Sequence, residues 1–419
     1  MKVIILGSGF LGATTAYFLS KQGVDVTVID RQNASAMECS FANGSQLSYS
    51  HAEPWANEGT IQKAVKWIGK DDAPLKFGFS TDPHMWWWTL KFLNQCNVKS
   101  ARKNSISMMR IGLFSRQVMH EILAEENIEF SYNNNGIIHV FFDEKEMKAA
   151  ISQSEFQKEK AKIPFDVLSA NQVVEYEKSL GHKKDQIVGG IVYPLDEVGC
   201  INQFSVGISD IAAKKYGADF KYNTNIVDIK TEGKNIVGIE TDKGVLKADK
   251  YVMAMGSYSY IFLKKIGLKV PIYPMKGYSI SVPITNMDAA PNMSITDASL
   301  KVVFCRLDNI LRAAGTAEFA GYNDDIDKKR ILMLKNGIRD RFPDIGDIDA
   351  ATEWSCLRPS TPDGPPILGK TSKYDNLYLN TGHGTLGWTQ GAGSAKIVSS
   401  LILKDDPILD LKGLTIDRY

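Results

Sequence analysis

Short apolar runs alternate with polar breaks along the first 30 residues. Residues 3–6 form a continuous apolar run, and residues 24–29 alternate between apolar and polar positions. Between them, Ala16 and Leu19 continue an apolar pattern at helical spacing, and Gly23 is a helix stop. The pattern therefore predicts a strand, a helix and a second strand, which is a βαβ unit with buried parallel strands.

Further elements are predicted along the rest of the chain. Residues 84–125, 146–182, 204–216 and 326–342 have the apolar spacing of helices, and a glycine-rich loop after residue 381 leads into a last helix. Strands are predicted at IIHVFF, 187–193, 218–222, 224–230, 236–241, 244–247, YVMAMGSYS and NLYLN, and in a second sheet at PIYPMKGYSISVPI, LKVVFCRL and NILRAAGTAEFA. The segment LRPSTPDGPPILG, with its prolines and glycines, is expected to be a fixed loop.

Nucleotide-type elements recur at the start, in the middle and at the end of the chain. A nicotinamide-binding Rossmann domain is normally contiguous, so the interruption favours a flavin fold with an inserted second sheet. The predicted class is α/β, with an FAD-binding Rossmann-like domain of the glutathione-reductase type and a second, mixed-sheet substrate domain. The expected division assigns 1–75, 146–268 and 350–419 to the FAD-binding domain, and 76–145 and 269–349 to the substrate domain.

Gly7, Gly9 and Gly12 follow the first strand at G-x-G-x-x-G spacing, and Asp30 ends the second strand. Gly7 permits a tight turn, Gly9 lets a pyrophosphate approach the backbone, and Gly12 lets the helix pack close to the sheet. The helix N-terminus would then face the phosphates, and Asp30 would bind a ribose diol. This predicts FAD or NAD rather than NADP, although Arg31 could instead meet a 2′-phosphate or lie at the surface.

Composition excludes several other classes of protein. The 419 residues carry a formal net charge of +1, so we expect no nucleic-acid partner. Five scattered cysteines indicate unpaired thiols in a reducing compartment, and no spacing typical of a structural metal site appears. We find no signal-peptide pattern and no apolar run of membrane-spanning length, so a cytoplasmic protein is expected.

Several stretches together resemble the FAD-dependent D-amino-acid oxidase superfamily, and within it the bacterial D-amino-acid dehydrogenases of the small-subunit type. They are ILGSGFLGATTAYFL, ANGSQLS, EPWA, KAVKW, DAPL, the WWW segment, YVMAMGSYS, IYPMKGYSI, LRPSTPDGPP and LNTGHGTLGWT. The resemblance implies oxidation of D-amino acids, with D-alanine favoured, to 2-keto acids and ammonia, by hydride transfer to flavin N5. Electrons would pass to a quinone or another respiratory acceptor. One departure is that His51 and Glu53 stand where close relatives are mostly small and apolar.

Two alternatives remain open. One is a related flavoenzyme that acts on D-hydroxyproline, D-proline or glycine. The other is a non-catalytic flavin subunit of an electron-transfer complex.

The resemblance also implies roles for individual residues. Arg358 matches the arginine that holds the substrate carboxylate, because a guanidinium grips a carboxylate bidentately. Tyr278 and Lys276 are weaker candidates for the substrate pocket. His383 lies between glycines, so we expect it to position the backbone or the flavin edge rather than to transfer protons.

The expected flavin-binding positions extend over the whole chain. Ile226 and Val227 either bracket the adenine or form an ordinary buried strand. The complete set is Val3, Ile4, Leu6, Gly7, Ser8, Gly9, Phe10, Leu11, Gly12, Asp30, Arg31, Asn43, Gly44, Ser45, Gln46, Ile226, Val227, Ala254, Gly256, Gly384, Thr385, Leu386, Gly387 and Trp388.

Trp86, Trp87 and Trp88 could form a patch that faces a membrane surface or a quinone, since tryptophan suits interfaces. Consecutive helical residues point in different directions, so we expect at least one of the three in the core. A reversible contact with the inner membrane is therefore a further expectation.

Overall fold

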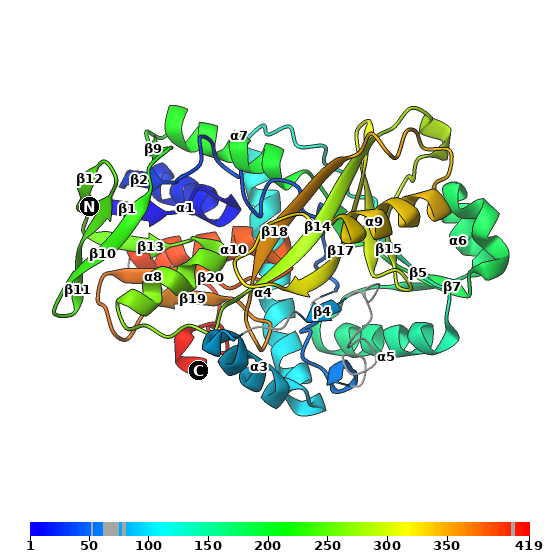
Figure 1. The fold of residues 1–419 in the computed structure, drawn as a ribbon, viewed down its shortest axis with the longest axis horizontal. Coiled ribbons are helices and arrows are strands. Elements are labelled where there is room, and N and C mark those ends of the chain that lie inside the picture. Colours follow the sequence, from blue (N-terminus) through cyan, green and yellow to red (C-terminus); the bar gives the residue numbers. More distant parts are fainter. Residues whose placement is uncertain (52, 62–74, 78–80, 404–406) are drawn as a thin grey trace.

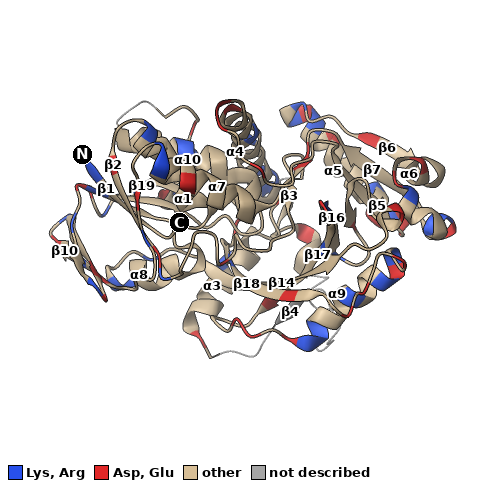
Figure 2. Ribbon diagram, turned by 90° about the horizontal axis from the view of Figure 1, so that it is seen from above, with Lys and Arg blue, Asp and Glu red and all other residues tan. Residues whose placement is uncertain are grey.

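The computed structural model describes residues 1–51, 53–61, 75–77, 81–403 and 407–419. Two large sheets lie in different halves of the molecule, and both chain ends lie in the half that contains β1 (Figure 1). Two stretches that contributed to the family resemblance, KAVKW and the first three residues of DAPL, lie outside the described residues. Positions of Lys or Arg and of Asp or Glu both occur along outer elements such as α5 (Glu144–Ala161), α6 (Ala170–Tyr176) and α9 (Lys328–Arg341) (Figure 2).

The first sheet has the strand order β19-β20-β13-β1-β2-β9, with all neighbours parallel except the β19–β20 pair. Its strands come from the beginning, the middle and the end of the chain, which confirms the predicted recurrence of nucleotide-type elements. They are β1 (Lys2–Leu6), β2 (Asp25–Ile29), β9 (Asp219–Lys221), β13 (Lys250–Met253), β19 (Ile367–Lys370) and β20 (Leu377–Thr381).

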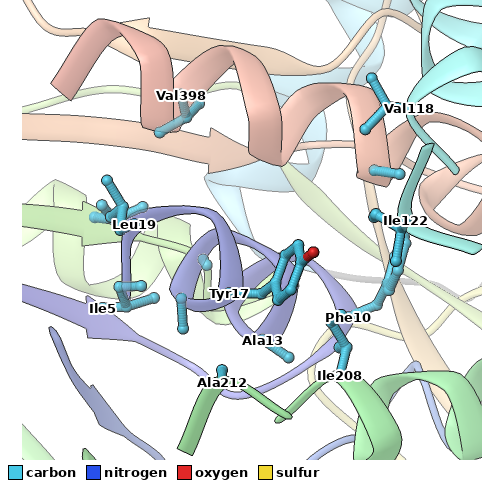
Figure 3. Packing of buried hydrophobic residues seen from close by; sticks show 14 of the residues in the cluster. Ile5, Phe10, Ala13, Tyr17, Leu19, Val118, Ile122, Ile208, Ala212 and Val398 are labelled. Carbon is cyan, nitrogen blue, oxygen red and sulfur yellow. The ribbon is translucent and has the colours of Figure 1, made fainter. Parts of the chain in front are cut away.

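Apolar side chains cover both faces of this sheet, which explains the continuous apolar run of β1. Val3 and Ile5 join one core, whereas Ile4 and Leu6 point to the opposite face and join another. The first core lies among α1 (Phe10–Lys21), α4 (Val98–Glu125), α7 (Ile201–Lys214) and α10 (Gly387–Leu403). Figure 3 shows Tyr17 and other α1 side chains among residues of these helices.

The second sheet has the order β18-β14-β17-β16-β15-β5-β7-β6, and β4 (Leu75–Phe77) also pairs with β17. Helix α9 (Lys328–Arg341) packs against β14 and β17, and its apolar residues join theirs in a separate core. The strands are β5 (Ile137–Phe141), β6 (Asp166–Ser169), β7 (Gly189–Tyr193), β14 (Tyr273–Pro283), β15 (Ser294–Asp297), β16 (Val302–Leu307), β17 (Ile310–Phe319) and β18 (Thr352–Ser360).

The remaining elements are shorter or lie outside the two large sheets. The helices are α3 (Pro83–Gln95), α5 (Glu144–Ala161), α6 (Ala170–Tyr176) and α8 (Ser259–Lys265), with 3-10 turns at Lys178–Gln186, Gly256–Tyr258, Met287–Ala289 and Ile416–Arg418. The strands are β3 (Gln46–Leu47), which pairs with β8 (Glu197–Val198), and the antiparallel set β10 (Ile226–Glu232), β11 (Asn235–Thr241) and β12 (Gly244–Leu246).

The structure differs from the expected division in the placing of three strands and one helix, and from the predicted elements at the segment around Arg358. Strands β6, β7 and β18 belong to the second sheet, although their residues were assigned to the FAD-binding part. Helix α4, assigned to the substrate part, packs on α10. The segment around Arg358, expected to be a loop, is strand β18. Proline is tolerated there because β18 is an edge strand.

Candidate active site

A cavity of about 720 Å³ extends from the loops at the carboxyl ends of β1, β2 and β13 to the surface of the second sheet. It is lined by the glycine turn, by residues 42–46, by parts of β17 and β18, and by the start of α10. The carboxyl ends of parallel strands are where open α/β sheets bind ligands.

The three glycines of the turn have different local environments. Gly7 has φ +99°, and a Cβ there would lie 2.7 Å from the carbonyl oxygen of Ala254. A Cβ on Gly12 would lie 1.9 Å from the carbonyl oxygen of Gly7, so α1 packs against β1 only without a side chain. At Gly9 the nearest atom would be Ser40 Oγ at 3.6 Å, which leaves room for a ligand.

The N-terminus of α1 is open to this space. Gly9 is the N-cap and provides no side-chain cap, and Ser40 Oγ accepts from the Phe10 N–H at 3.1 Å. Such an end carries unpaired N–H groups and a partial positive charge, which suit a pyrophosphate. These residues therefore fit a dinucleotide cofactor.

Asp30 lines the cavity at the end of β2. Its Oδ2 accepts from the backbone N–H of Ser8 at 2.6 Å and from the Ser8 hydroxyl at 2.8 Å. Arg31 donates through Nε to Glu38 at 2.7 Å and lies 4.2 Å from the centre of the Tyr258 ring. The guanidinium of Arg31 is thus held by protein groups, which favours the interpretation without a 2′-phosphate.

Residues 43–46 form a loop that is hydrogen-bonded to the second sheet. Asn43 Oδ1 accepts from the Ser45 N–H at 2.9 Å, which forms an Asx turn, and Ser45 has φ +60°. Ser45 Oγ accepts from Arg312 Nη1 at 3.2 Å, and Gln46 Nε2 donates to Ser294 Oγ at 2.8 Å. The side chains of Ser45 and Gln46 are therefore bound to β17 and β15, and residues 43–46 line the cavity.

The loop before α10 lies against the end of β18. Residues Ser360 and His383 form an antiparallel bridge, and the Gly384 N–H donates to the Pro359 carbonyl at 2.9 Å. His383 Nε2 lies 2.9 Å from Ser394 Oγ, and burial lowers the pKa of His383 to about 3. This histidine is therefore neutral near pH 7 and cannot act as a cationic acid there.

Arg358 lies on β18, lines the cavity and is partly buried. Its Nη1 donates to the Thr316 carbonyl at 3.0 Å. Within the described part of the chain, Nε and Nη2 have no hydrogen-bond partner. The cavity wall thus contains a guanidinium whose Nε and Nη2 groups are available as donors. This pair forms the fork that binds a carboxylate.

The amine of Lys276 and the hydroxyl of Tyr278 are both directed to Glu318. The Tyr278 hydroxyl donates to Glu318 Oε2 at 2.5 Å, and its ring belongs to the core under α9. Lys276 Nζ lies 3.6 Å from the same Glu318 oxygen and donates to the Asp325 carbonyl at 3.0 Å. Lys276 does not line the cavity. Both side chains lie on the face of β14 opposite to Gly277, because strand residues alternate between faces.

Most of the expected site residues line the cavity. Those that do are Gly7, Gly9, Phe10, Leu11, Asp30, Arg31, Asn43, Gly44, Ser45, Gln46, Ile226, Ala254, Gly256, Gly384, Thr385, Leu386, Gly387 and Trp388, together with Arg358, Tyr278 and His383. Those that do not, apart from Lys276, are Val3, Ile4, Leu6, Ser8, Gly12 and Val227. Val3, Ile4 and Leu6 of β1 are fully buried and hold the turn in place, whereas Val227 of β10 is 49% exposed.

Several lining residues were not predicted. Trp354 and Cys356 precede Arg358 by four and two positions, so reading the segment as a strand would have placed all three on one face. Thr316 and His139 reach the cavity from β17 and β5, and no local motif marks them. His51 and Glu53, the departures noted in the sequence, also line the cavity.

The family of FAD-dependent oxidoreductases named DAO matches residues 2–401 of the chain. The chain belongs to this family. D-amino acid dehydrogenases from Vibrio atlanticus and Paramagnetospirillum magneticum are each 40% identical to it, over 100% of the chain and 100% and 99% of their own lengths.

Two solved structures have the same overall architecture as this chain. Glycine oxidase from Geobacillus kaustophilus superposes with a TM-score of 0.77 at 20% identity, over 100% of this chain and 98% of its own. L-proline dehydrogenase from P. horikoshii gives 0.74 at 17% identity, over 100% and 97%. The DAO fold and the FAD-dependent oxidoreductase family are thus shown.

Proposed function

We propose that this FAD-dependent oxidoreductase is a D-amino-acid dehydrogenase with D-alanine as its favoured substrate. It oxidises the amino acid to an imino acid, which water converts to a 2-keto acid and ammonia, and two electrons pass to a separate acceptor. The observation that carries the proposal is the guanidinium of Arg358 in the wall of the cavity, with Nε and Nη2 free of described partners. Relatives at about 40% identity with the same printed activity support it.

The residues of the chain bind and orient the reactants. FAD, when bound, supplies the two-electron oxidant at this site. Arg358 holds the substrate carboxylate and so fixes the position of Cα. The N–H groups at the start of α10 and its helix dipole stabilise negative charge beside them. With a neutral substrate amine, the C–H step needs no protein base, in keeping with a neutral His383 bonded to Ser394.

For the acceptor, we propose a quinone reached at a membrane surface through α3. No helix in the described part of the chain is long and apolar enough to cross a bilayer. Trp86, Leu90 and Leu93 are 53%, 68% and 45% exposed, and their i, i+4, i+7 spacing places them on one helix face. Trp88 is buried and donates Nε1 to the Ser360 carbonyl at 2.8 Å, which ties α3 to the end of β18.

The test is anaerobic reduction of the purified holoenzyme by D-alanine, followed by steady-state kinetics with a quinone analogue and with oxygen. We expect flavin absorbance to bleach, and turnover to be faster with the quinone. Arg358→Lys should keep FAD but lower kcat/KM through a higher KM, by about 2–4 kcal/mol of lost carboxylate binding.

Arg306→Lys, on β16 of the same sheet but away from the cavity lining, is the matched control and should behave as the wild type. A flavin that no D-amino acid reduces would make the chain an electron carrier, and reduction by glycine or proline alone would make it a different amine oxidoreductase. Unchanged kinetics in Arg358→Lys would remove Arg358 from the site.

A further inference from the structure

Arg358 reaches across a neighbouring strand to its hydrogen-bond partner. In the β14–β18 pairing, Met275 is opposite Arg358 and Gly277 is opposite Cys356, so Gly277 is diagonal to Arg358. The guanidinium crosses β14 at this glycine and ends at Thr316 on β17. Diagonal neighbours in a sheet are within reach of a long side chain.

The glycine leaves the space that the guanidinium occupies. A Cβ on Gly277 would lie 2.1 Å from both Cζ and Nη2 of Arg358 and 2.6 Å from its Nε. These separations are far below van der Waals contact, so any side chain at position 277 would displace the guanidinium. Gly277 has no left-handed φ that would by itself demand glycine.

A β-bulge in β17 lies opposite the same glycine. Lys276 pairs with Glu318 and Tyr278 pairs with Gly315, so two residues of β17, Thr316 and Ala317, face the single residue Gly277. Thr316 has φ +59°, a left-handed conformation that is strained for a β-branched residue. The bulge interrupts the ladder, and the Thr316 carbonyl accepts from Arg358 Nη1 instead.

We propose that Gly277 and the Thr316 bulge are positioning elements for substrate binding. They hold the guanidinium flat across β14, bind its Nη1, and leave the Nε–Nη2 edge to receive the amino-acid carboxylate. This inference rests on the proposed role of Arg358. It explains why position 277, in IYPMKGYSI, is glycine and why Thr316 has a strained backbone conformation. The nucleotide-binding motifs explain neither feature.

The experiment compares Gly277→Ala, Arg358→Ala and the double variant, with Gly238→Ala as the control. A Cβ on Gly238 of β11 would meet Val245 Cγ1 at 2.8 Å, so it tests a similar steric insertion away from the cavity. For each holoenzyme we measure FAD content, kcat and KM for D-alanine, and the Kd of a carboxylate lacking an α-amine, such as benzoate, from the flavin spectrum.

We expect Gly277→Ala to raise KM and the benzoate Kd by about tenfold or more, with a smaller change in kcat, because a charged arginine is retained but displaced. In the Arg358→Ala background the same substitution should have no further effect, since its target is gone. Gly238→Ala should leave both constants unchanged.

Other outcomes distinguish the positioning role of Gly277 from the proposed carboxylate-binding role of Arg358. If Arg358→Ala weakens binding but Gly277→Ala does not, the positioning role is wrong and the proposed function stands. If Arg358→Ala itself binds D-alanine and benzoate normally, the assignment of the carboxylate site fails. If Gly277→Ala loses FAD, the double variant decides: recovery of FAD supports the clash with Arg358, whereas continued loss overturns the positioning role.

Discussion

At the scale of single residues, the glycines of the first turn divide into two kinds. Gly7 and Gly12 are required by the protein itself, because a side chain at either position would strike backbone atoms. Gly9 is different, since a Cβ there would meet only Ser40 Oγ at an ordinary contact distance of 3.6 Å. The space beside Gly9 is therefore kept open for a ligand rather than for folding.

This difference predicts separable effects on folding and on FAD binding. Gly9→Val should leave the thermal unfolding of the apoprotein near that of the wild type, while FAD binding is lost because the pyrophosphate cannot approach. Gly12→Ala should destabilise the apoprotein by about 1–3 kcal/mol or more, since α1 must move away from β1. Differential scanning fluorimetry of both apoproteins and FAD titration give the two readouts. Normal FAD affinity in Gly9→Val would move the pyrophosphate elsewhere.

At the scale of elements, alternation within a strand decides which residues reach the site. Lys276 and Tyr278 belong to IYPMKGYSI, a stretch that carried the family resemblance, yet the polar ends of both side chains point to Glu318. Once β14 is known to be a strand, period-two alternation places them on one face and Gly277 on the other. The sequence predicted the strand, but the choice of face depends on which sheet surface meets the nucleotide-binding loops, and that is a tertiary property.

A buried carboxyl group, that of Asp196, lies between strand β8 and Ser50. Asp196, just before β8, is fully buried, and its Oδ1 accepts from the Ser50 N–H at 2.7 Å. Burial raises the pKa of Asp196 from 3.8 to about 7. Between these values the folded protein holds a proton that the unfolded chain has released, so the stabilisation is complete below pH 3.8 and is lost as pH rises through 7.

Asp196→Asn keeps an oxygen acceptor for Ser50 and cannot ionise. Relative to the wild type, we expect this variant to gain stability as pH rises from about 4 to 7, by at most about 1.4 kcal/mol per pH unit. Urea unfolding of both proteins at intervals over this range measures the effect. A stability difference that is the same at every pH would show that folding does not raise the pKa of Asp196.

At the scale of the whole molecule, the sequence predicted the class of fold better than its boundaries. The βαβ unit, the apolar strands β13 and β20 and the glycine-rich loop before α10 each carry a local signal, and all three lie in the half of the molecule that contains β1 (Figure 1). Strands β6 and β18 carry weak signals because β6 is short and β18 contains a proline. Strand β7 was predicted, but the membership of all three strands in the second sheet depends on distant pairing partners. The cavity is lined by residues from the turn after β1 to the start of α10, so no single stretch of sequence could define it.

The exposed apolar face of α3 predicts that the protein binds to a membrane surface. Trp86, Leu90 and Leu93 are exposed on one face, and Lys91 lies 5.1 Å from the centre of the Trp87 ring, a cation that could meet lipid phosphates. We expect the holoenzyme to float with liposomes that contain anionic lipid. Trp86→Ser and Leu90→Ser should each reduce flotation and slow turnover with a membrane-embedded quinone, while turnover with a water-soluble dye is unchanged.

Two controls distinguish this surface from general hydrophobicity and from folding. Val245→Ser removes an equally exposed apolar side chain, at 52%, from β12 and should leave flotation unchanged. Trp88→Ser should instead lower thermal stability, because Trp88 is buried against Phe319 and bonded to Ser360. If flotation is absent in the wild type, or equal in all four variants while oxygen is reduced to peroxide as fast as the quinone is reduced, α3 is not a membrane contact and the protein is an oxidase that works in solution.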